Sequence, residues 1–490
     1  MGGSRAVPEN SPVRPVSRYN SSPKFNLAEE HNVTFRGILG GVLVAVSLAV
    51  PARAADDAAE HRLSNGLRIV VKTDRRAPVA VVMAWYRVGS IDEVNGVTGV
   101  AHVLEHMMFK GTPNLQPGEY SRLIAAAGGR DNAFTANDFT GYFAMLQKSQ
   151  LELALRLEAD RMANLTLSPE EFSKEIKVVM EERRLRTDDR PRSLVYEQLM
   201  ATALTAHPYR NPIIGWMNDL ENMRVEDAKE FYQRWYAPNN VVLVVVGDVD
   251  PREVFALSEK YFGAIPSRPL PARKPQDEPP QLGVKRVTVK APAELPYVMM
   301  TFRVPVLRDP ETDWEPYALR MLAAVLSGND AARLPRTLVK EQRIASSAGA
   351  SYDGIARGPD FFYLSGSPVS GRTAAEVEQG LRREMAKIME EGVTQEELDR
   401  VKAQAIAAEV YQRDSMFFQA RVIGVLEMTG LSHRSLDVQL KKLREVTPDQ
   451  VREVARKYFR EDALTIATLD PQPSSGAKPA APPAGLRHAQ

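Results

Sequence analysis

The sequence predicts an α+β protein made of two similar domains that are joined by a linker. Its 490 residues exceed the roughly 100–200 residues of one ordinary domain, and 44% of them are hydrophobic, which is enough for more than one core. Beyond residue 60, strand-like and helix-like segments alternate along the chain. A proline-rich stretch then separates two parts that repeat the same short patterns, so we interpret the chain as an internal duplication.

The first 54 residues precede the predicted domains. Residues 1–32 are polar and show no periodicity, which indicates a disordered extension or a start assigned too far upstream, with the true start near Val33. Residues 33–54 have the pattern of a signal peptide: a basic residue, an apolar run from Ile38 to Val50, and a small-residue site that predicts cleavage after Ala54. Because the run is too short to span a bilayer comfortably, we expect a periplasmic or otherwise secreted protein with no stable membrane span after cleavage. An uncleaved signal anchor is the alternative.

The first domain is predicted to occupy residues 55–265. Runs rich in β-branched residues indicate strands, and apolar stripes at helical spacing indicate helices. The expected strands are Arg68–Val71, Val79–Trp85 and Val241–Val246, and the expected helices are Ala101–Phe109 and Glu170–Leu185.

Residues 266–284 form the predicted linker. Six prolines lie between Pro266 and Pro280. Proline lacks the N–H and fixes φ, so this stretch should be extended and semi-rigid, and it would permit a hinge. The second domain follows at 285–470, and the tail at 471–490 is rich in Pro and Ala and is expected to be disordered.

Two pairs of similar segments indicate the duplication. Leu167–Glu171 and Val393–Glu397 each open a predicted helix with a hydroxyl residue followed by an acidic pair. Val225–Tyr236 resembles Thr447–Phe459, and a strand-like run follows each. The alternative interpretation is convergent patterning in an α+β chain.

Composition excludes several classes of function. Sixty-three basic and 62 acidic residues give a net charge of +1, so no overall field is available to hold nucleic acid. The chain has no cysteine, which excludes disulfides, thiolate zinc sites, iron–sulfur clusters and cysteine nucleophiles. Any metal site must therefore be built from His, Asp and Glu, and the chain has seven histidines.

His102, Glu105 and His106 form the strongest candidate site. Positions i and i+4 of a helix share a face, so both imidazoles can bind one ion, and Glu105 lies on nearly the same face. This donor set suits zinc with one position left for water; the ion lowers the pKa of that water toward about 7, and Glu105 takes its proton. The pattern is the inverted His-x-x-Glu-His motif of zinc hydrolases. The alternative is two ordinary surface histidines. A third protein ligand is needed, and the many acidic residues leave its identity open.

Several further segments make the chain resemble the pitrilysin- or insulinase-type (M16) zinc metallopeptidases, and among them the short two-domain subgroup that includes the mitochondrial processing peptidase β-subunit. The resemblance runs from Leu63 to about residue 470. It implies two homologous M16-type (LuxS/MPP-like) domains, each an antiparallel-rich sheet packed with helices. The segments that carry it, besides the histidine motif, are Leu63–Leu67, Val88–Glu93, Phe109–Thr112, Gly128–Thr135, His207–Tyr209, Gly215 and Tyr236–Asn239.

The resemblance also implies the remaining site residues and one zinc ion per chain. The third zinc ligand of the family, about 76 residues after the second histidine, corresponds to Glu182. Glu175 takes the place of an acidic residue that orients a ligand histidine. Glu181 is the nearest rival ligand, about 100° away on the same helix. The substrate-binding residues Asn132, Ala133, Phe134 and Thr135 resemble the family's edge strand, where a peptide pairs by β-addition.

The second domain lacks the corresponding groups and is expected to hold no metal. Leu319, Leu322, Ala323 and Ala408 align with the three motif residues and Glu182 of the first domain.

Many relatives also carry an arginine and a tyrosine, seven residues apart, in the second domain, where they grip the substrate or the oxyanion. Val339 and Ser346 occupy those places here, and Arg333, Arg336 and Tyr352 are nearby candidates without the family spacing. An oxyanion donor is worth roughly 2.7–4 kcal/mol. We therefore expect either a weak peptidase alone or a partner: a homologous subunit without the zinc motif that supplies the pair in a heterodimer, or a second copy in a homodimer.

The sequence thus predicts an exported zinc-dependent endopeptidase that hydrolyses peptides or unfolded segments. Two other functions stay open, namely a non-catalytic assembly subunit with the same fold and a dedicated maturase of one peptide.

Overall fold

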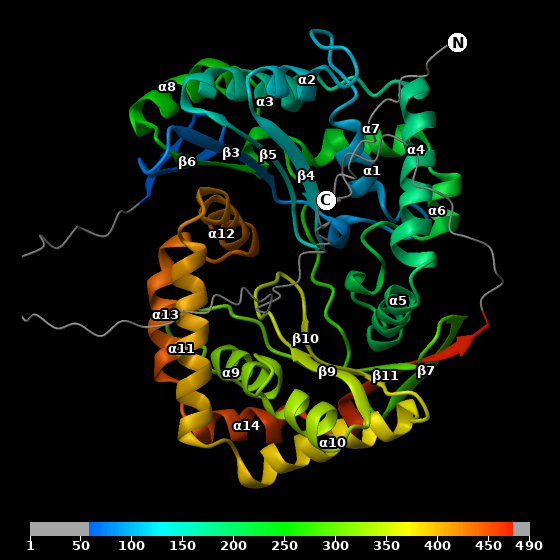
Figure 1. Cartoon of the computed structure of the whole chain (residues 1–490). Helices are drawn as coiled ribbons and strands as arrows, with labels where there is room; N and C mark the ends of the chain where they lie inside the picture. The colour runs from blue at the N-terminus through cyan, green and yellow to red at the C-terminus, as the bar shows by residue number, and fades with distance from the viewer. Residues whose placement is uncertain (1–57, 474–490) are drawn as a thin grey trace, which may run out of the picture.

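The computed structural model describes residues 58–473, so the expected leader and its cleavage site after Ala54 lie outside the described residues. The chain forms an upper and a lower α+β half in Figure 1, each built on one sheet. The first half contains β1 (Ala59–Arg62), β2 (Arg68–Thr73), β3 (Val79–Tyr86), α1 (Val100–Met107), α2 (Glu119–Ala126), β4 (Arg130–Thr135), β5 (Thr140–Gln147), α3 (Leu151–Asn164), α4 (Pro169–Arg183), α5 (Pro191–Ala203), α6 (Met217–Asn222), α7 (Val225–Trp235), β6 (Val241–Gly247) and α8 (Pro251–Phe262). The second half contains β7 (Lys285–Pro292), β8 (Tyr297–Val304), α9 (Glu315–Ser327), β9 (Ala345–Ser351), β10 (Asp360–Pro368), α10 (Ala374–Glu391), α11 (Gln395–Gln412), α12 (Met416–Thr429), α13 (Leu436–Glu445), α14 (Pro448–Tyr458) and β11 (Leu464–Gln472).

The two sheets share one topology. Their strand orders are β1-β2-β6-β3-β5-β4 and β7-β11-β8-β10-β9. In each sheet one pair is parallel, β2 with β6 and β7 with β11, and the other pairs are antiparallel; β1 adds an extra edge strand to the first sheet. Strands β7 to β11 therefore correspond in order to β2 to β6, which confirms the predicted α+β class with antiparallel-rich sheets.

The repeated segments open equivalent helices in the two halves. The Ser168 hydroxyl accepts a hydrogen bond from the Glu171 N–H at the start of α4. The Thr394 hydroxyl accepts the equivalent bond from the Glu397 N–H at the start of α11. Each bond satisfies one of the N–H groups that the first turn of a helix leaves unpaired.

Two boundaries differ from the sequence-based expectation. The charged helix expected at Glu170–Leu185 ends as α4 at Arg183 and continues directly as a π-helix, Arg184–Asp188. Strand β11 continues to Gln472, because Pro471 and Gln472 still pair with the end of β7. The described chain thus stays ordered two residues beyond the expected start of the tail.

Both faces of the first sheet are buried, which explains why its inner strands are apolar at nearly every position. Val82 and Leu243 belong to the core under α1, α3 and α8. Their neighbours Met83 and Val244 point to the opposite face and pack against α12 of the second half. Successive strand residues alternate between faces, so a sheet covered on both sides needs continuous hydrophobic runs.

The two halves exchange one helix each. Helix α12 lies across β3 and β6 of the first sheet, where Gly424 lets it approach the buried indole of Trp85 (Figure 1). In return, Val195 and Leu199 of α5 pack on β7, β8 and β11 of the second sheet. Each half thus completes the other's core, and the two cannot separate without exposing both apolar faces to water.

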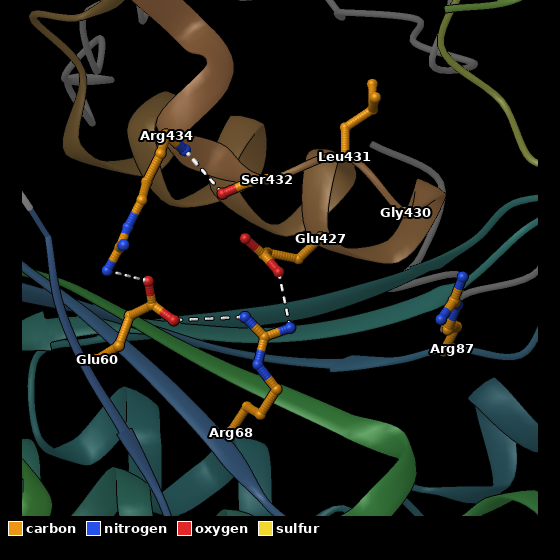
Figure 2. A pocket seen from close by; sticks show the side chains of 8 residues that line it. All are labelled: Glu60, Arg68, Arg87, Glu427, Gly430, Leu431, Ser432 and Arg434. Carbon is orange, nitrogen blue, oxygen red and sulfur yellow. Dashed lines mark hydrogen bonds and ion pairs between the residues drawn. The ribbon is translucent and has the colours of Figure 1, made fainter. Parts of the chain in front are cut away.

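Ion pairs reinforce the interface between the two halves, the seam, beside α12. Glu427 of α12 accepts a 2.8 Å bond from Arg68 of β2 (Figure 2). Its other oxygen lies 2.8 Å from His433 Nδ1. Glu60 of β1 is 2.8 Å from Arg434 of the second half. Glu60, Arg68, Glu427 and Arg434 line an open pocket of about 450 Å³. Polar contacts therefore close the seam at the β1 side of the first sheet.

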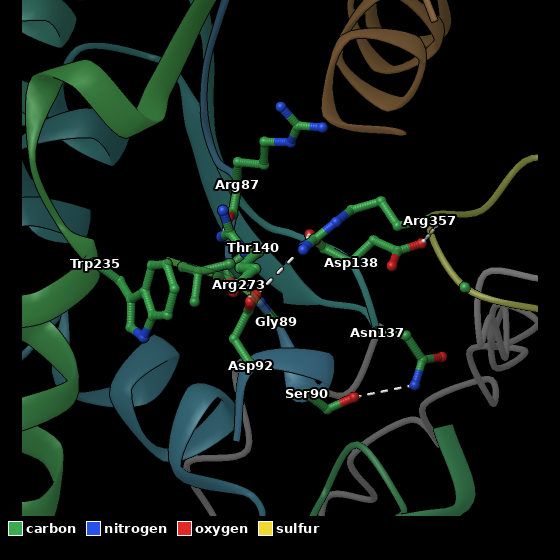
Figure 3. Close-up of polar contacts among 12 residues, drawn as sticks. Arg87, Gly89, Ser90, Asp92, Asn137, Asp138, Thr140, Trp235, Arg273 and Arg357 are labelled. Carbon is green, nitrogen blue, oxygen red and sulfur yellow. Dashed lines mark hydrogen bonds and ion pairs between the residues drawn. The ribbon is translucent and has the colours of Figure 1, made fainter. Parts of the chain in front are cut away.

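The segment between α8 and β7 has no helix or strand, but both halves hold it. Arg273 Nε lies 2.6 Å from Asp92 Oδ1 (Figure 3). The Glu278 carboxylate accepts bonds from the backbone N–H groups of residues 205–207. From the second half, Arg303 donates to the backbone carbonyls of Glu278 and Pro279. A hinge at this segment would have to break these contacts.

Within residues 58–473, no helix combines the length and hydrophobicity needed to cross a membrane.

Candidate metal centre

Helix α1 carries the predicted motif and is fixed at its N-terminus by a buried carboxylate. Glu93 accepts hydrogen bonds from the backbone N–H groups of Gly99 and Ala101 at 2.8 and 2.9 Å. These bonds satisfy N–H groups that the first turn of a helix leaves unpaired. Burial raises the pKa of Glu93 to about 8, although the two bonds lower it. Gly99 itself has φ 88°, and a Cβ atom at this position would lie 2.6 Å from the carbonyl oxygen of Ile214. The start of α1 is therefore rigid.

The structure brings His102, His106 and Glu182 together. Their donor atoms all lie within 4.8 Å of one another, and all three residues are buried. Glu182 Oε2 is 3.3 Å from His106 Nε2 and 3.8 Å from His102 Nε2. Ligands of a tetrahedral zinc ion at 2.0–2.1 Å are separated by about 3.3 Å, so small adjustments would suffice. Among residues 58–473 this is the one group of three such side chains found close enough to hold an ion.

Glu182 also has the surroundings expected of a metal ligand. It is 1% exposed, and neither of its oxygens accepts a hydrogen bond from the described residues. A buried ionised carboxylate that accepts no hydrogen bond is costly, so a cation beside Oε2 would offset part of the penalty. Glu181, the rival for this role, has a side chain that is 31% exposed and lies 3.0 Å from Arg184. Only Glu182 faces the histidines.

Glu175 lies behind the second histidine. Its Oε2 atom is 3.2 Å from His106 Nδ1, and its Oε1 atom is 2.5 Å from the ammonium group of Lys110. A carboxylate on the far nitrogen of a ligand histidine fixes the tautomer that leaves the near nitrogen for the metal. Lys110 in turn holds the carboxylate.

Glu105 projects from the same helix toward the sheet edge. It is 2% exposed, and its Oε2 atom accepts a 2.6 Å hydrogen bond from the hydroxyl of Thr135 on β4. Burial raises the pKa of Glu105 to about 7, although the nearby His106 and the bond from Thr135 lower it. A carboxylate whose pKa lies close to neutral can both accept and return a proton.

The electrostatics of the donor set follow from burial and the mutual attraction of its members. Burial lowers the pKa of His102 to about 4, so its imidazole is neutral at pH 7. Burial opposes the charged forms of the other two, yet the Glu175 and Glu182 carboxylates raise the pKa of His106 to about 9. The two histidines lower the pKa of Glu182 to about 2. The ionised Glu182 carboxylate thus strongly attracts positive charge.

The predicted substrate residues lie beside this site. Asn132, Ala133, Phe134 and Thr135 belong to β4, which pairs with β5 on one side and forms the edge of the described sheet. Ala133 contributes to the core on the α1 side of the sheet, and Phe134 packs on the α12 side against Trp85. An edge strand offers unpaired backbone N–H and C=O groups to an extended peptide.

The second half presents an apolar surface at the equivalent place. Leu319, Leu322 and Ala323 are buried in α9, which follows β8 as α1 follows β3. Ala408 lies on α11, the counterpart of α4.

The three candidates for the absent arginine and tyrosine are engaged within the second half. Arg333 is 2.7 Å from Glu397, Arg336 is 3.8 Å from Glu341, and the Tyr352 hydroxyl donates to the Pro305 carbonyl. Ser346, at the tyrosine place, donates to backbone carbonyls of residues 367 and 368. These contacts give none of them a part in the metal centre.

Sequence reasoning missed one charged neighbour of the centre. Arg186, on the π-helix after α4, lies 2.8 Å from Glu182 Oε1. Arg186 lies four positions after Glu182 in the sequence, and this i,i+4 spacing was the only indication that the two side chains could pair.

Comparisons with known proteins agree with this geometry. Residues 68–216 match the family model described as Insulinase (Peptidase family M16), and residues 222–405 match Peptidase M16 inactive domain. The chain is 32% identical over 420 residues to "Zinc protease PqqE" of Helicobacter pylori, covering 84% of this chain and 92% of that protein. It resembles the crystal structure of a protease from Helicobacter pylori with a TM-score of 0.81 at 29% identity, covering 85% of this chain and 100% of the other. The periplasmic protease PqqL from Escherichia coli has a similar fold, with a TM-score of 0.73 at 19% identity, over 85% of this chain and 48% of that one.

Proposed function

This chain belongs to peptidase family M16, the insulinase family, and from that premise we propose that it is a zinc-dependent endopeptidase of peptides or unfolded segments. One observation carries the proposal: the buried His102–His106–Glu182 cluster lies beside an edge strand. Glu105, from the helix of the two histidines, is bonded to Thr135 of that strand. The site therefore combines metal ligands, a proton acceptor and a surface for an extended chain.

The roles of the side chains follow from their positions. His102, His106 and Glu182 would hold one zinc ion, and Glu175 would orient His106. Zinc, when bound, polarises the scissile carbonyl and lowers the pKa of water. Glu105 accepts the proton of the attacking water and passes it to the leaving amine. A peptide paired with β4 presents its backbone to this site largely regardless of side chains, which suits flexible substrates.

We also propose that the protein is exported and works with a homologous partner. The pattern at residues 33–54 supports cleavage after Ala54, and N-terminal sequencing of the protein from separated cell fractions tests it. Val339 and Ser346 stand where relatives carry the arginine and tyrosine, so a homologous subunit without the zinc motif would supply that pair. Copurification of a tagged chain with such a homologue, or with a second copy of itself, tests the assembly.

The central experiment compares Glu105→Gln, Glu182→Gln and Glu181→Gln by zinc content and by cleavage of a quenched peptide, with and without the partner. Glu105→Gln should keep zinc and lose about 10²–10⁴-fold in kcat, because it removes the proton acceptor and leaves the ligands intact. Glu182→Gln should lose zinc, whereas Glu181→Gln, changed at the adjacent exposed residue, should behave as the parent.

Hydrolysis by Glu105→Gln at the parent rate would refute the assigned role. A zinc-loaded parent chain that cleaves nothing with any partner would instead support the assembly-subunit function, and cleavage of one peptide only would support a dedicated maturase.

A further inference from the structure

The polypeptide changes its helical geometry immediately after Glu182. Helix α4 passes without a break into the π-helix Arg184–Asp188, in which the N–H of Asp189 donates to the carbonyl of Arg184 at 2.8 Å. This i→i+5 bond widens the turn by one residue. Such π segments are rare inside helices and occur frequently at functional sites, because they redirect the side chains around them.

The widened turn places Arg186 against the outer oxygen of Glu182. Arg186 Nη1 lies 2.8 Å from Glu182 Oε1, while Oε2 of the same carboxylate faces the two imidazoles. The two oxygens are thus assigned to different partners. The neighbouring arginines point elsewhere: Arg183 is 2.8 Å from Glu197, and Arg184 is 3.0 Å from Glu181.

Burial of the carboxylate makes this contact consequential. The Glu182 side chain is 2% exposed and that of Arg186 is 43% exposed, so the guanidinium covers the solvent side of a buried carboxylate. Oε1 accepts no hydrogen bond from the described residues, so Arg186 acts on it as an ion-pair partner at 2.8 Å, and this attraction is strong because little water reaches the carboxylate. The attraction of the guanidinium for Oε1 favours the orientation in which Oε2 alone faces the imidazoles.

The duplicated half provides an internal comparison. Ala408 of α11 stands at the place of Glu182, and the place of Arg186 is then taken by Gln412. Helix α11 remains an α-helix up to Gln412. At this place the half without a ligand glutamate therefore has neither the arginine nor the widened turn, since its own π-helix, Pro335–Glu341, lies elsewhere. The shared fold does not require either feature here.

We propose that Arg186 is a positioning residue that holds Glu182 as a one-oxygen ligand of the zinc ion. This inference rests on the proposed function, since it concerns the same metal site. Arg186 acts on the ion only through Glu182, and its effect should appear first in metal affinity and only secondarily in turnover.

The test measures zinc dissociation constants by chelator competition for the parent chain, Arg186→Gln, Arg186→Lys and the matched control Arg184→Gln. Arg184 is on the same π-helix, has a side chain that is 46% exposed, and pairs with a non-ligand glutamate. Arg186→Gln should weaken zinc binding by about 10–100-fold, as expected for loss of a group that orients a ligand. Arg186→Lys should fall in between, because an ammonium keeps the charge without the planar fork, and Arg184→Gln should match the parent.

Thermal unfolding of the zinc-free proteins separates positioning from a merely structural role. Equal melting temperatures for zinc-free Arg186→Gln and the parent, together with weaker zinc binding, support the inference. Parent-like or tighter zinc binding by Arg186→Gln overturns it, as does an equal loss in Arg184→Gln.

Peptide cleavage by the zinc-loaded parent distinguishes failure of the role of Arg186 from failure of the proposed function. A parent that binds zinc but cleaves nothing refutes the peptidase and leaves the affinity test of Arg186 valid. A parent that cleaves, with zinc affinity unchanged in Arg186→Gln, refutes only the role of Arg186. A parent that binds no zinc refutes both.

Discussion

Replacing Gly424 with alanine should destabilise the seam between the two halves. An added Cβ atom would lie 1.9 Å from Cε2 of Trp85, whose indole is fully buried and packs edge-on against Phe134 and Phe139. Carbon atoms in contact sit about 3.5–4.0 Å apart, so α12 or the indole must move by about 1.5–2 Å.

The magnitude follows from two opposing effects. Overpacking a filled core costs typically 1–3 kcal/mol, and the rigid indole puts this site at the upper end, about 3 kcal/mol. Alanine is better than glycine within a helix by about 1 kcal/mol. The Gly424→Ala protein should therefore lose about 2 kcal/mol of unfolding free energy.

Urea unfolding followed by circular dichroism and by tryptophan fluorescence measures this loss. Gly380→Ala in α10 is the control, since its Cβ would meet the movable end of Leu338 at 2.8 Å and should perturb stability less. Trp85→Phe creates room for the new methyl group. The double variant should therefore lose less unfolding free energy than the sum of the losses in the two single variants, by at least about 1 kcal/mol. A Gly424→Ala protein as stable as the parent, with additive effects in the double variant, would refute the close packing of α12 on the first sheet.

Three further predictions concern the seam and the site. Burial opposes ionisation of Glu427, but His433 and Arg68 lower its pKa to about 2, so its contribution to stability is present above about pH 4.5 and disappears as the pH falls toward 2. Glu427→Gln should then cost up to about 3 kcal/mol in urea unfolding at pH 7 and progressively less below pH 4.5, and an equal cost at all pH values would contradict this. Thr135→Val removes a hydrogen bond that lowers the pKa of Glu105, so the acidic limb of the kcat/KM profile should move to higher pH; an unmoved limb would argue against Glu105 as the proton acceptor. Zinc at 100-fold its Kd should stabilise the parent by about 2.7 kcal/mol and raise its Tm, whereas a similar rise for His106→Ala would point to another site.

Local patterns in the sequence were sufficient for the three strands and two helices predicted in the first half, and for the two histidines of the candidate metal centre. The spacing of His102 and His106 places both imidazoles on one helix face wherever that helix lies. The hydroxyl residues before α4 and α11 cap those helices by accepting a hydrogen bond from the backbone N–H three residues later. These bonds involve no distant segment. Runs of β-branched residues also indicated β2, β3 and β6 within two residues of their ends.

Family resemblance, and not local pattern, singled out Glu182. It stands 76 residues beyond His106, and acidic residues are too frequent for spacing alone to choose one. In the structure the choice between Glu181 and Glu182 is a matter of helix rotation, because only one of two adjacent side chains can face α1.

The sequence by itself determined a duplicated α+β chain with a zinc-type histidine motif in one copy, because caps, strand alternation and i,i+4 spacing depend only on near neighbours. Tertiary structure alone decided that α12 covers the first sheet, that α5 covers the second, and that Arg186 meets Glu182 on a widened turn. Trp85 and Gly424 are separated by more than 300 residues, and their contact reflects which apolar faces fit each other closely. Such complementarity is a property of packed surfaces and leaves no periodic signal along the chain.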